Sequence, residues 1–450
     1  METIIQLVEQ TIWVYLTIPL LLAISLMFTF YLKGPQFRLG KMLAALTKKT
    51  PGSPVSPTQS LALALAARVG VGSLGGVALA IAIGGPGAIF WMWISALLTA
   101  SASFAESTLA QMFKRKDREG FFGGPAYYIQ DGLKNRPLAV TYAIMIILTY
   151  TLGFSAVQTN TIAASFHNTL AIPPLATGMA LTALTASIIF GGATLITKMA
   201  GKVVPIIAIF YLGMGLIVMF TRFEFIPEFF RLIFTGAFQP APLMGGVGGS
   251  VIFTVMTGLK RGIFSNEAGL GSGAHPAAIT DSEHATEQGY IQAFGVYLTT
   301  LVVTTVTAFL ILVTDAHHLV ATGGTGIELT QFAMNSLFGN TGTYLLALSI
   351  FFFGFTTIPT AYFYGESNMK FLFKKRWTLT ILRWAVLLAV FFSSFTSARL
   401  IFSLADIGTG LTAIINLIAL QLLSKKLWAY IRPEKGLKTT GKNRRQFPSF

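Results

Sequence analysis

The chain has 450 residues, of which 53% are hydrophobic and only 11% are charged, and its formal net charge is +15 at pH 7. Soluble proteins carry about 25% charged residues, so this composition argues against a soluble protein with a large core. The positive charges lie in short clusters between apolar runs, which argues against nucleic acid as a partner. We therefore expect an all-helical protein that crosses a lipid bilayer many times.

Apolar runs of about 20 residues, the length that crosses a bilayer as a helix, recur along the chain and predict about eleven membrane-spanning helices. These helices are expected near residues 10–32, 58–84, 86–113, 137–167, 175–196, 202–221, 244–262, 286–314, 340–365, 376–396 and 398–424. Two amphipathic stretches, 224–238 and 327–338, are too short to span. They are expected to lie at the interface or to cap the bundle from outside.

The placement of Lys and Arg predicts the orientation, because cytoplasmic loops of membrane proteins are enriched in these residues. With the N-terminus outside, most of the 32 basic residues fall in inner loops, at 33–49, 114–136, 198–202, 260–261, 370–376 and 425–445. The C-terminus is then cytoplasmic. The expected location is the plasma membrane, which is the inner membrane in a bacterium.

The second predicted helix contains a cluster of glycines between Gly70 and Gly76, near the middle of the membrane. Each glycine costs about 1 kcal/mol of helix stability relative to alanine, so the helix is expected to unwind there. Unwound backbone at this depth lines a cavity or is buried in protein. It frees N–H groups that suit a carboxylate and carbonyls that suit a small cation. Close helix packing through small residues is the structural alternative.

The seventh predicted helix repeats this pattern. It opens on a second set of glycines, Gly245, Gly246, Gly248 and Gly249. Gly258 is expected to interrupt it, and the polar, glycine-rich segment 260–272 follows. Two broken helices spaced five apart are what inverted repeats of five helices predict.

The segment from Arg261 to Ser272, RGIFSNEAGLGS, resembles the characteristic motif of the alanine/glycine:cation symporter family. Further segments are similar to the family pattern, at 76–81, 84–87, 90–93, 104–106, 123–129, 158–160 and 364–366. The resemblance covers roughly residues 60–420. It implies the leucine-transporter fold, with two inverted five-helix repeats, two broken helices and one extra N-terminal helix.

The resemblance implies a single integral membrane transporter domain over residues 1–450. Within it, four segments are expected: a leading helix and cytoplasmic linker, a first repeat, a second repeat and a basic cytoplasmic tail, at 1–57, 58–221, 244–424 and 425–450.

The chain departs from the family pattern at two places. The usual G-T-G-N at the first break is replaced by residues 70–73, Gly-Val-Gly-Ser, and no Trp closely follows the hydroxyl pair Thr356 and Thr357. These departures remove polar groups from the expected site, so they leave the transported amino acid open and make a second sodium site less expected.

Five positions match the sodium site of the leucine-transporter fold. The resemblance implies carbonyl ligands from Ala66, Val69 and Phe353 and hydroxyl ligands from Thr356 and Thr357. Neutral oxygens suit a hard cation such as sodium. The alternative is that each hydroxyl bonds to a carbonyl of its own helix. No cofactor is expected besides the coupling ion.

The substrate is expected to dock its carboxylate on the first break. The candidate binding residues are Gly70, Gly72, Ser73, Gly75, Gln158, Phe253 and Thr254. Gln158 is preferred over Asn160, because buried amides are costly without a partner and the two point to different faces of their helix. Each amide could instead hold helices together.

Three charged residues are expected to form a structural or gating ion pair within the membrane. They are Arg68, with Glu106 or Glu267 as its partner, because an unpaired charge at that depth is expensive. Asp406 is expected to be either a proton site or a hydrogen-bond acceptor.

The sequence therefore predicts a secondary active symporter that moves a small neutral amino acid into the cell with sodium. Proton coupling and a different small amino acid remain open. A channel is disfavoured because no ring of charges or carbonyl filter is visible. A transport-dead receptor stays an alternative. A membrane enzyme is disfavoured because the sequence lacks cysteine, the metal motif HExxH and a nucleophile–base set.

Overall fold

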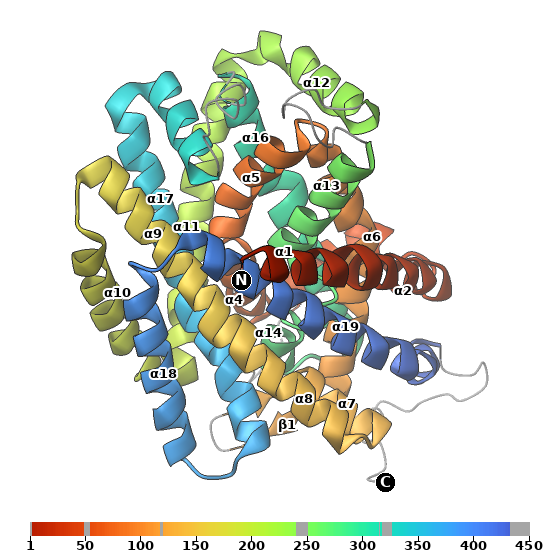
Figure 1. Cartoon of the computed structure of the whole chain (residues 1–450). Coiled ribbons are helices and arrows are strands. Elements are labelled where there is room, and N and C mark those ends of the chain that lie inside the picture. Colours follow the sequence, from red (N-terminus) through yellow and green to blue (C-terminus); the bar gives the residue numbers. More distant parts are fainter. Residues whose placement is uncertain are drawn as a thin grey trace.

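The computed structural model of the chain describes residues 2–48, 55–117, 120–239, 251–314, 316 and 326–432. Most of these residues are helical (Figure 1). The only β-strands within the described ranges are β1 (Arg115–Lys116) and β2 (Phe121–Phe122), which form an antiparallel hairpin. The predicted all-helical class is confirmed.

Seven described helices are long and apolar enough to cross a membrane. Three of them contain a π-helical turn. The other four are α6 (Ala88–Met112), α11 (Gly192–Thr221), α19 (Ala398–Ile431) and α17 (Ile327–Leu372), the last of which is kinked at Gly339. An eighth span is formed by α4 (Pro57–Arg68) and α5 (Gly75–Gly84), whose axes differ by 67°. Shorter apolar helices are α10 (Pro174–Ile189) and α18 (Trp377–Ser393). Together with α13 (Val251–Asn266) and α14 (Ala274–Ala278), these segments follow the order of the predicted spans.

Three spans include a π-helical turn, which shifts the register of side chains and is frequent at functional sites. The first is η1 (Ile12–Thr17), between α1 (Glu2–Thr11) and α2 (Ile18–Tyr31). The second is η4 (Ile147–Phe154), between α8 (Arg136–Ile146) and α9 (Ser155–Leu170). The third is η6 (Leu298–Val303), between α15 (Ala285–Tyr297) and α16 (Thr304–Leu312). Both η4 and η6 lie in spans that contact the first broken helix.

Both predicted amphipathic stretches are helical. One is α12 (Ile226–Phe238), which lies across one end of the bundle in Figure 1, after the short η5 (Phe223–Phe225). It buries Phe229 and Ile233 and accepts a hydrogen bond from the Trp91 indole at the Ala237 carbonyl, at 3.1 Å. The other stretch is the first part of α17, which a left-handed Gly339 (φ 61°) separates from the rest of the helix.

Several predicted boundaries are wrong. Residues 198–202, expected as a loop, lie inside α11, since α10 ends earlier and α11 begins earlier than the hydropathy indicated. Residues 260–261 lie inside α13, and Gly258 does not interrupt that helix. A Cβ on Gly258 would lie 2.5 Å from Trp91 Cβ, so this glycine permits close packing on α6. The predicted glycine cluster at 245–249 lies outside the described residues, as does most of the basic tail.

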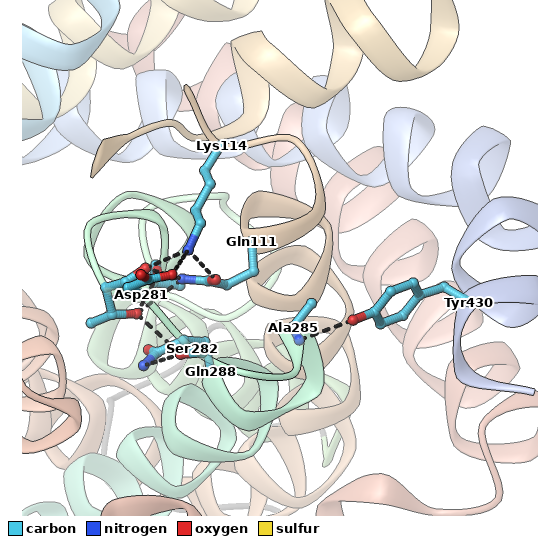
Figure 2. Close-up of polar contacts among 9 residues, drawn as sticks. Gln111, Lys114, Asp281, Ser282, Ala285, Gln288 and Tyr430 are labelled. Carbon is cyan, nitrogen blue, oxygen red and sulfur yellow. Dashed lines mark hydrogen bonds and ion pairs between the residues drawn. The ribbon is translucent and has the colours of Figure 1, made fainter. Parts of the chain in front are cut away.

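Three short helices flank the spans: η2 (Pro35–Phe37) and α3 (Leu39–Thr47) in the predicted linker, and α7 (Pro125–Leu133) before α8. Figure 2 shows how the segment after α14 is anchored. Lys114, just beyond α6, donates to the Thr280 carbonyl at 2.6 Å and lies 3.6 Å from the Asp281 carboxylate. Burial lowers the pKa of Lys114 while Asp281 opposes this shift. The Tyr430 hydroxyl of α19 accepts a bond from the Ala285 N–H at 3.1 Å.

The leading helix packs beside the second broken helix and α19. Its Trp13 indole donates to the Asp406 carbonyl at 2.9 Å, and Thr17 Oγ1 donates to the Gly410 carbonyl at 3.3 Å. Leu21 lies so close to Gly269 that a Cβ on this glycine would be 2.5 Å from its side chain. The extra helix therefore braces the break between α13 and α14.

Candidate functional site: two broken helices

The first broken helix unwinds where the glycines predicted it would. After α4 ends at Arg68, Gly70 is extended (φ −100°, ψ −154°), a single 3-10 turn η3 (Val71–Ser73) follows, and α5 begins at Gly75. The residues of this break are buried. Since the first N–H groups of a helix have no partner within it, the start of α5 presents donors and a positive dipole end to the protein interior.

Gln158 lies directly against this break. Its amide oxygen accepts a hydrogen bond from the Val71 N–H at 3.0 Å, and its side chain is buried. A Cβ on Gly70 would be 2.9 Å from that oxygen and 2.8 Å from Thr357 Oγ1. Gly70 therefore allows α9 and α17 to approach the unwound backbone together.

Ser73 links the two broken helices. Its hydroxyl lies 3.1 Å from the hydroxyl of Ser265, on α13, and 3.2 Å from the Arg68 carbonyl. The Ser73 carbonyl accepts from Thr307 Oγ1, on α16, at 3.0 Å. Both halves of the site are thus joined by neutral hydrogen bonds.

An aromatic stack covers Gly72 and was not predicted. The ring of Phe264 would lie 3.2 Å from a Cβ on Gly72, and it stacks on Phe154 with ring centroids 5.0 Å apart. Phe154 in turn stacks on Tyr150 at 4.4 Å. Phe154 and Tyr150 both belong to η4, so the π-helical turn aims them at the break. Beside the stack, a Cβ on the buried Gly76 would meet nothing within 4 Å, so space remains at the start of α5.

Four of the five predicted sodium ligands are joined by hydrogen bonds. Thr357 Oγ1 lies 2.7 Å from the Ala66 carbonyl, at the end of α4, and 2.8 Å from the Phe353 carbonyl, one turn earlier on α17. Thr356 Oγ1 bonds to the Phe353 carbonyl at 3.1 Å. Val69 is buried next to this group, at the first unwound position.

The second broken helix owes its shape to the segment that resembles the family motif. Glu267 adopts a left-handed conformation (φ 56°), as do Gly269 (φ 81°) and Gly271 (φ 83°). Left-handed backbone is costly for residues with a side chain, so the two glycines are required there. A Cβ on Gly273 would collide with the Arg68 guanidinium. Gly273 therefore leaves room for the Arg68 side chain to pass the break.

The predicted ion pair of Arg68 is not formed by direct contact. Its guanidinium, which is buried, donates to the Gln292 carbonyl at 2.9 Å and to Ser103 Oγ at 3.3 Å. Glu106 accepts from the Gly271 N–H at 2.9 Å and from the Asn416 amide at 3.0 Å. Both acids lie near Arg68, as predicted, but each lies farther than 4.0 Å from its nitrogens.

Asp406 accepts a hydrogen bond from Arg261, which is one of its two predicted roles, and it is also part of an ion cluster that was not predicted. Its carboxylate lies 2.7 Å from Lys260 Nζ and 2.8 Å from the Arg261 guanidinium, and Lys260 also contacts Glu9 of the leading helix. Asp406 is 2% exposed. The cluster joins α1, α13 and α19 just before α13 reaches the break.

Two predicted substrate residues lie away from the first break. Thr254 donates to the Gly84 carbonyl at 2.9 Å, and Phe253 is half-exposed beside it. Gly84 ends α5, about 15 Å along the helix from the break. Phe264 and Ser265, which the motif contains but which were not singled out, lie at the break instead. Asn160 donates to the carbonyls of Ser393 and Thr396, so it joins α9 to the end of α18.

A cavity of about 140 Å³ opens between α4, the β-hairpin, α11 and α17. Its lining is partly charged, with Asp117, Lys198, Glu366 and Lys370 beside apolar groups such as Phe122 and Phe363. Lys370 lies 3.2 Å from Glu366 and 4.0 Å from Asp117. The cavity is on the side of the bundle where the N-terminal end of α4 lies.

A solved structure supports the helical arrangement. A crystallised manganese transporter from Eremococcus coleocola superposes with a TM-score of 0.52, covering 82% of this chain and 78% of that one at 13% sequence identity. A likeness at this identity shows the fold alone. The fold of this chain is thus one used by a membrane transporter, with the helical class and broken helices that the sequence predicted.

Sequence comparison identifies the family. The model of the sodium:alanine symporter family matches residues 1–447. A probable sodium/glutamine symporter of Bacillus subtilis is 40% identical over 447 residues, which is 98% of this chain and 92% of that protein. A sodium/proton-dependent alanine carrier of Bacillus sp. (strain PS3) is 36% identical over 399 residues, or 85% and 89% of the two chains. The chain belongs to the sodium:alanine symporter family, whose members carry out cation-coupled amino-acid transport and are not enzymes.

Proposed function

We propose that this protein is a sodium-coupled symporter of a small neutral amino acid, with alanine or glycine as the reference substrate. The observation that carries the proposal is the meeting of Gly70, Gln158 and Thr357 at the first break. There, only the short unwound segment after α4 separates the neutral oxygens of Ala66 and Thr357 from the N–H donors at the start of α5.

The substrate carboxylate docks on the N–H groups at the start of α5, near Gly72, Ser73 and Gly75. These groups carry the positive end of the helix dipole, which favours an anionic group. Space beside Gly76 accommodates a small side chain, and Phe264 limits its size from the other side. Because Gln158 accepts from the Val71 N–H, its amide nitrogen is directed elsewhere and is available to a substrate.

The sodium ion is held by the carbonyls of Ala66, Val69 and Phe353 and the hydroxyls of Thr356 and Thr357. Oxygen ligands without charge select a hard metal ion, and this set has no group that titrates near neutral pH. Both relatives are named as sodium-dependent, one as a sodium/glutamine symporter and the other as a sodium/proton-dependent alanine carrier. They differ in the amino acid, so glutamine is the second substrate to test.

Thr357→Val tests the sodium site directly. Valine keeps the volume of threonine but removes the oxygen that lies between α4 and α17. We expect the sodium concentration for half-maximal alanine uptake to rise about tenfold, since one ligand is worth about 1 kcal/mol or more. This sodium concentration is measured from alanine uptake into proteoliposomes as a function of external sodium.

Thr360→Val is the matched control, because the Thr360 hydroxyl bonds only to the Thr356 carbonyl of its own helix among described residues, at 2.8 Å. Its sodium dependence should stay at the wild-type value. Equal sodium dependence for Thr357→Val and wild type would place the coupling ion elsewhere.

We further propose that the N-terminus is outside the plasma membrane and the C-terminus is cytoplasmic. Since the chain has no cysteine, single cysteines report the side. Arg136→Cys and Glu224→Cys place them at exposed positions, the first residue of α8 and η5 just before α12. On intact cells an impermeant maleimide should label only the cysteine at 224, and permeabilisation should expose the one at 136. The reverse pattern would invert the orientation.

A further inference from the structure

Glu267 is a buried carboxyl group without a partner. It is 1% exposed, and neither of its carboxyl oxygens accepts a hydrogen bond from a described residue. The neighbouring Ser272 hydroxyl donates to the backbone carbonyl of Glu267, at 3.5 Å, and not to its carboxyl. An ionised carboxylate in such a place is strongly disfavoured unless a cation or a hydrogen-bond donor compensates it.

The backbone at Glu267 is also unusual. Its φ of 56° is left-handed, although glutamate has no preference for this region. Non-glycine residues in this conformation cost of order 1–3 kcal/mol and cluster at functional sites. This left-handed conformation directs the Glu267 side chain from the break between α13 and α14 into the protein interior. A structural hydrogen bond would explain such strain, but this side chain makes none with the described residues.

The charges around Glu267 do not balance. Two carboxyl groups, those of Glu106 and Glu267, face one cation, Arg68, within the described part of the chain. The Arg68 nitrogens Nη1 and Nη2 are satisfied by neutral oxygens, and Nε has no partner. With both acids ionised, the cluster would carry one uncompensated negative charge inside the membrane. One further positive charge is therefore needed for neutrality.

The hydrogen bonds assign that charge to one of the two acids. Glu106 Oε2 accepts from the Gly271 N–H and from the Asn416 amide, and both bonds favour the ionised form. Glu267 accepts none. On the hydrogen bonds, the ionised form is better compensated at Glu106 than at Glu267, and an ionised Glu106 would balance Arg68.

The other titratable groups near Glu267 are three tyrosines, which are neutral at physiological pH. Tyr150 lies on η4, Tyr364 on α17 and Tyr142 on α8. The Tyr142 hydroxyl donates to the Leu270 carbonyl at 3.0 Å, whereas those of Tyr150 and Tyr364 have no partner among described residues. Two hydroxyls without described partners thus lie near the unpartnered carboxyl, and groups of this kind can pass a proton.

We propose that Glu267 is a proton-binding site in the second broken helix, separate from the sodium site, and that transport requires the protonated form. The proton comes from water and neutralises the Glu267 carboxylate. Loss of that proton places a second negative charge near Arg68. Attraction between Glu267 and Arg68 then shifts the backbone at the break between α13 and α14. The transport part rests on the proposed function, whereas the binding of the proton does not.

Infrared spectroscopy of the purified protein in lipid tests the site without any substrate. A protonated carboxyl gives a carbonyl stretching band that disappears when the bulk pH is raised. We expect Glu267→Gln to lose one such band relative to wild type, and the control Asp131→Asn, outside the spans, to keep it. A band kept in Glu267→Gln would overturn the assignment. So would a wild-type protein in which the band appears only when sodium is withheld, because a metal ion would then occupy the site.

Alanine uptake driven by sodium, measured from acid to alkaline pH, tests the transport part. Wild-type uptake should fall at least tenfold over the pH range in which the band disappears, and uptake by Glu267→Gln, which mimics the neutral acid, should not vary with pH in that range. Parallel pH profiles of the two proteins would overturn the requirement for protonation. If alanine is not transported at all, the proposed substrate fails while the infrared result still decides the proton site.

Discussion

Gly70→Ala should reduce uptake at least a hundredfold while the protein still folds. The new methyl group would lie 2.8 Å from Thr357 Oγ1 and 2.9 Å from the Gln158 amide oxygen. Real Cβ atoms do not approach oxygen so closely, so the methyl group must push apart the cation ligand and the amide that meet at the break. Initial rates of alanine uptake into proteoliposomes, normalised to protein content, measure the effect.

Gly213→Ala is the matched control for this prediction. Gly213 lies in α11, and a Cβ there would meet nothing within 4 Å. Its uptake should stay within twofold of wild type. If Gly70→Ala transported as well as Gly213→Ala, the glycines of the first break would serve helix packing alone, and the substrate site would have to lie elsewhere.

Asp406→Asn should destabilise the protein strongly. Among the described residues, it leaves Arg261 and Lys260 near the membrane interior with Glu9 as the one remaining compensating charge. Removing one partner of a buried ion pair costs about 3–5 kcal/mol. The melting temperature of the purified protein should fall clearly, and uptake should be lost as well because the cluster fixes α13 just before the second break.

The exposed pair of Glu228 and Arg231 on α12 provides the comparison. The Arg231 guanidinium lowers the pKa of Glu228, but both side chains are in contact with solvent. Glu228→Gln should leave the melting temperature unchanged, since surface ion pairs contribute little. Equal melting temperatures for Asp406→Asn and Glu228→Gln would show that the cluster is not structurally important.

The sequence predicted the first break well because its cause is local, whereas Gly258, the predicted interruption of the second helix, lies inside α13. Glycine clusters destabilise a helix wherever they occur, so the break at Gly70 could be located from residue types alone. The same holds for Thr357, whose hydroxyl pair stood out in an apolar run. The class of fold followed from the spacing of the two breaks and from the composition.

The remaining features depend on packing that residue types do not reveal. Phe264 and Phe154 are two of many phenylalanines in apolar runs, and only the π-helical turn η4 brings their rings together over Gly72. The sequence pattern predicts an inner loop at Lys260 and Arg261, because two adjacent basic residues are rare inside a membrane helix. Their partners Asp406 and Glu9 are distant in sequence, so the compensation was not visible.

The central claim, that a sodium gradient drives alanine uptake through the first break, is tested most directly in proteoliposomes containing the wild-type protein. Labelled alanine uptake is compared under an inward sodium gradient and under the same gradient of choline, with equal pH on both sides. The account predicts accumulation above equilibrium with sodium and only equilibration, or no uptake, with choline. Equal accumulation with choline, or accumulation that requires an imposed pH gradient and not sodium, would contradict it.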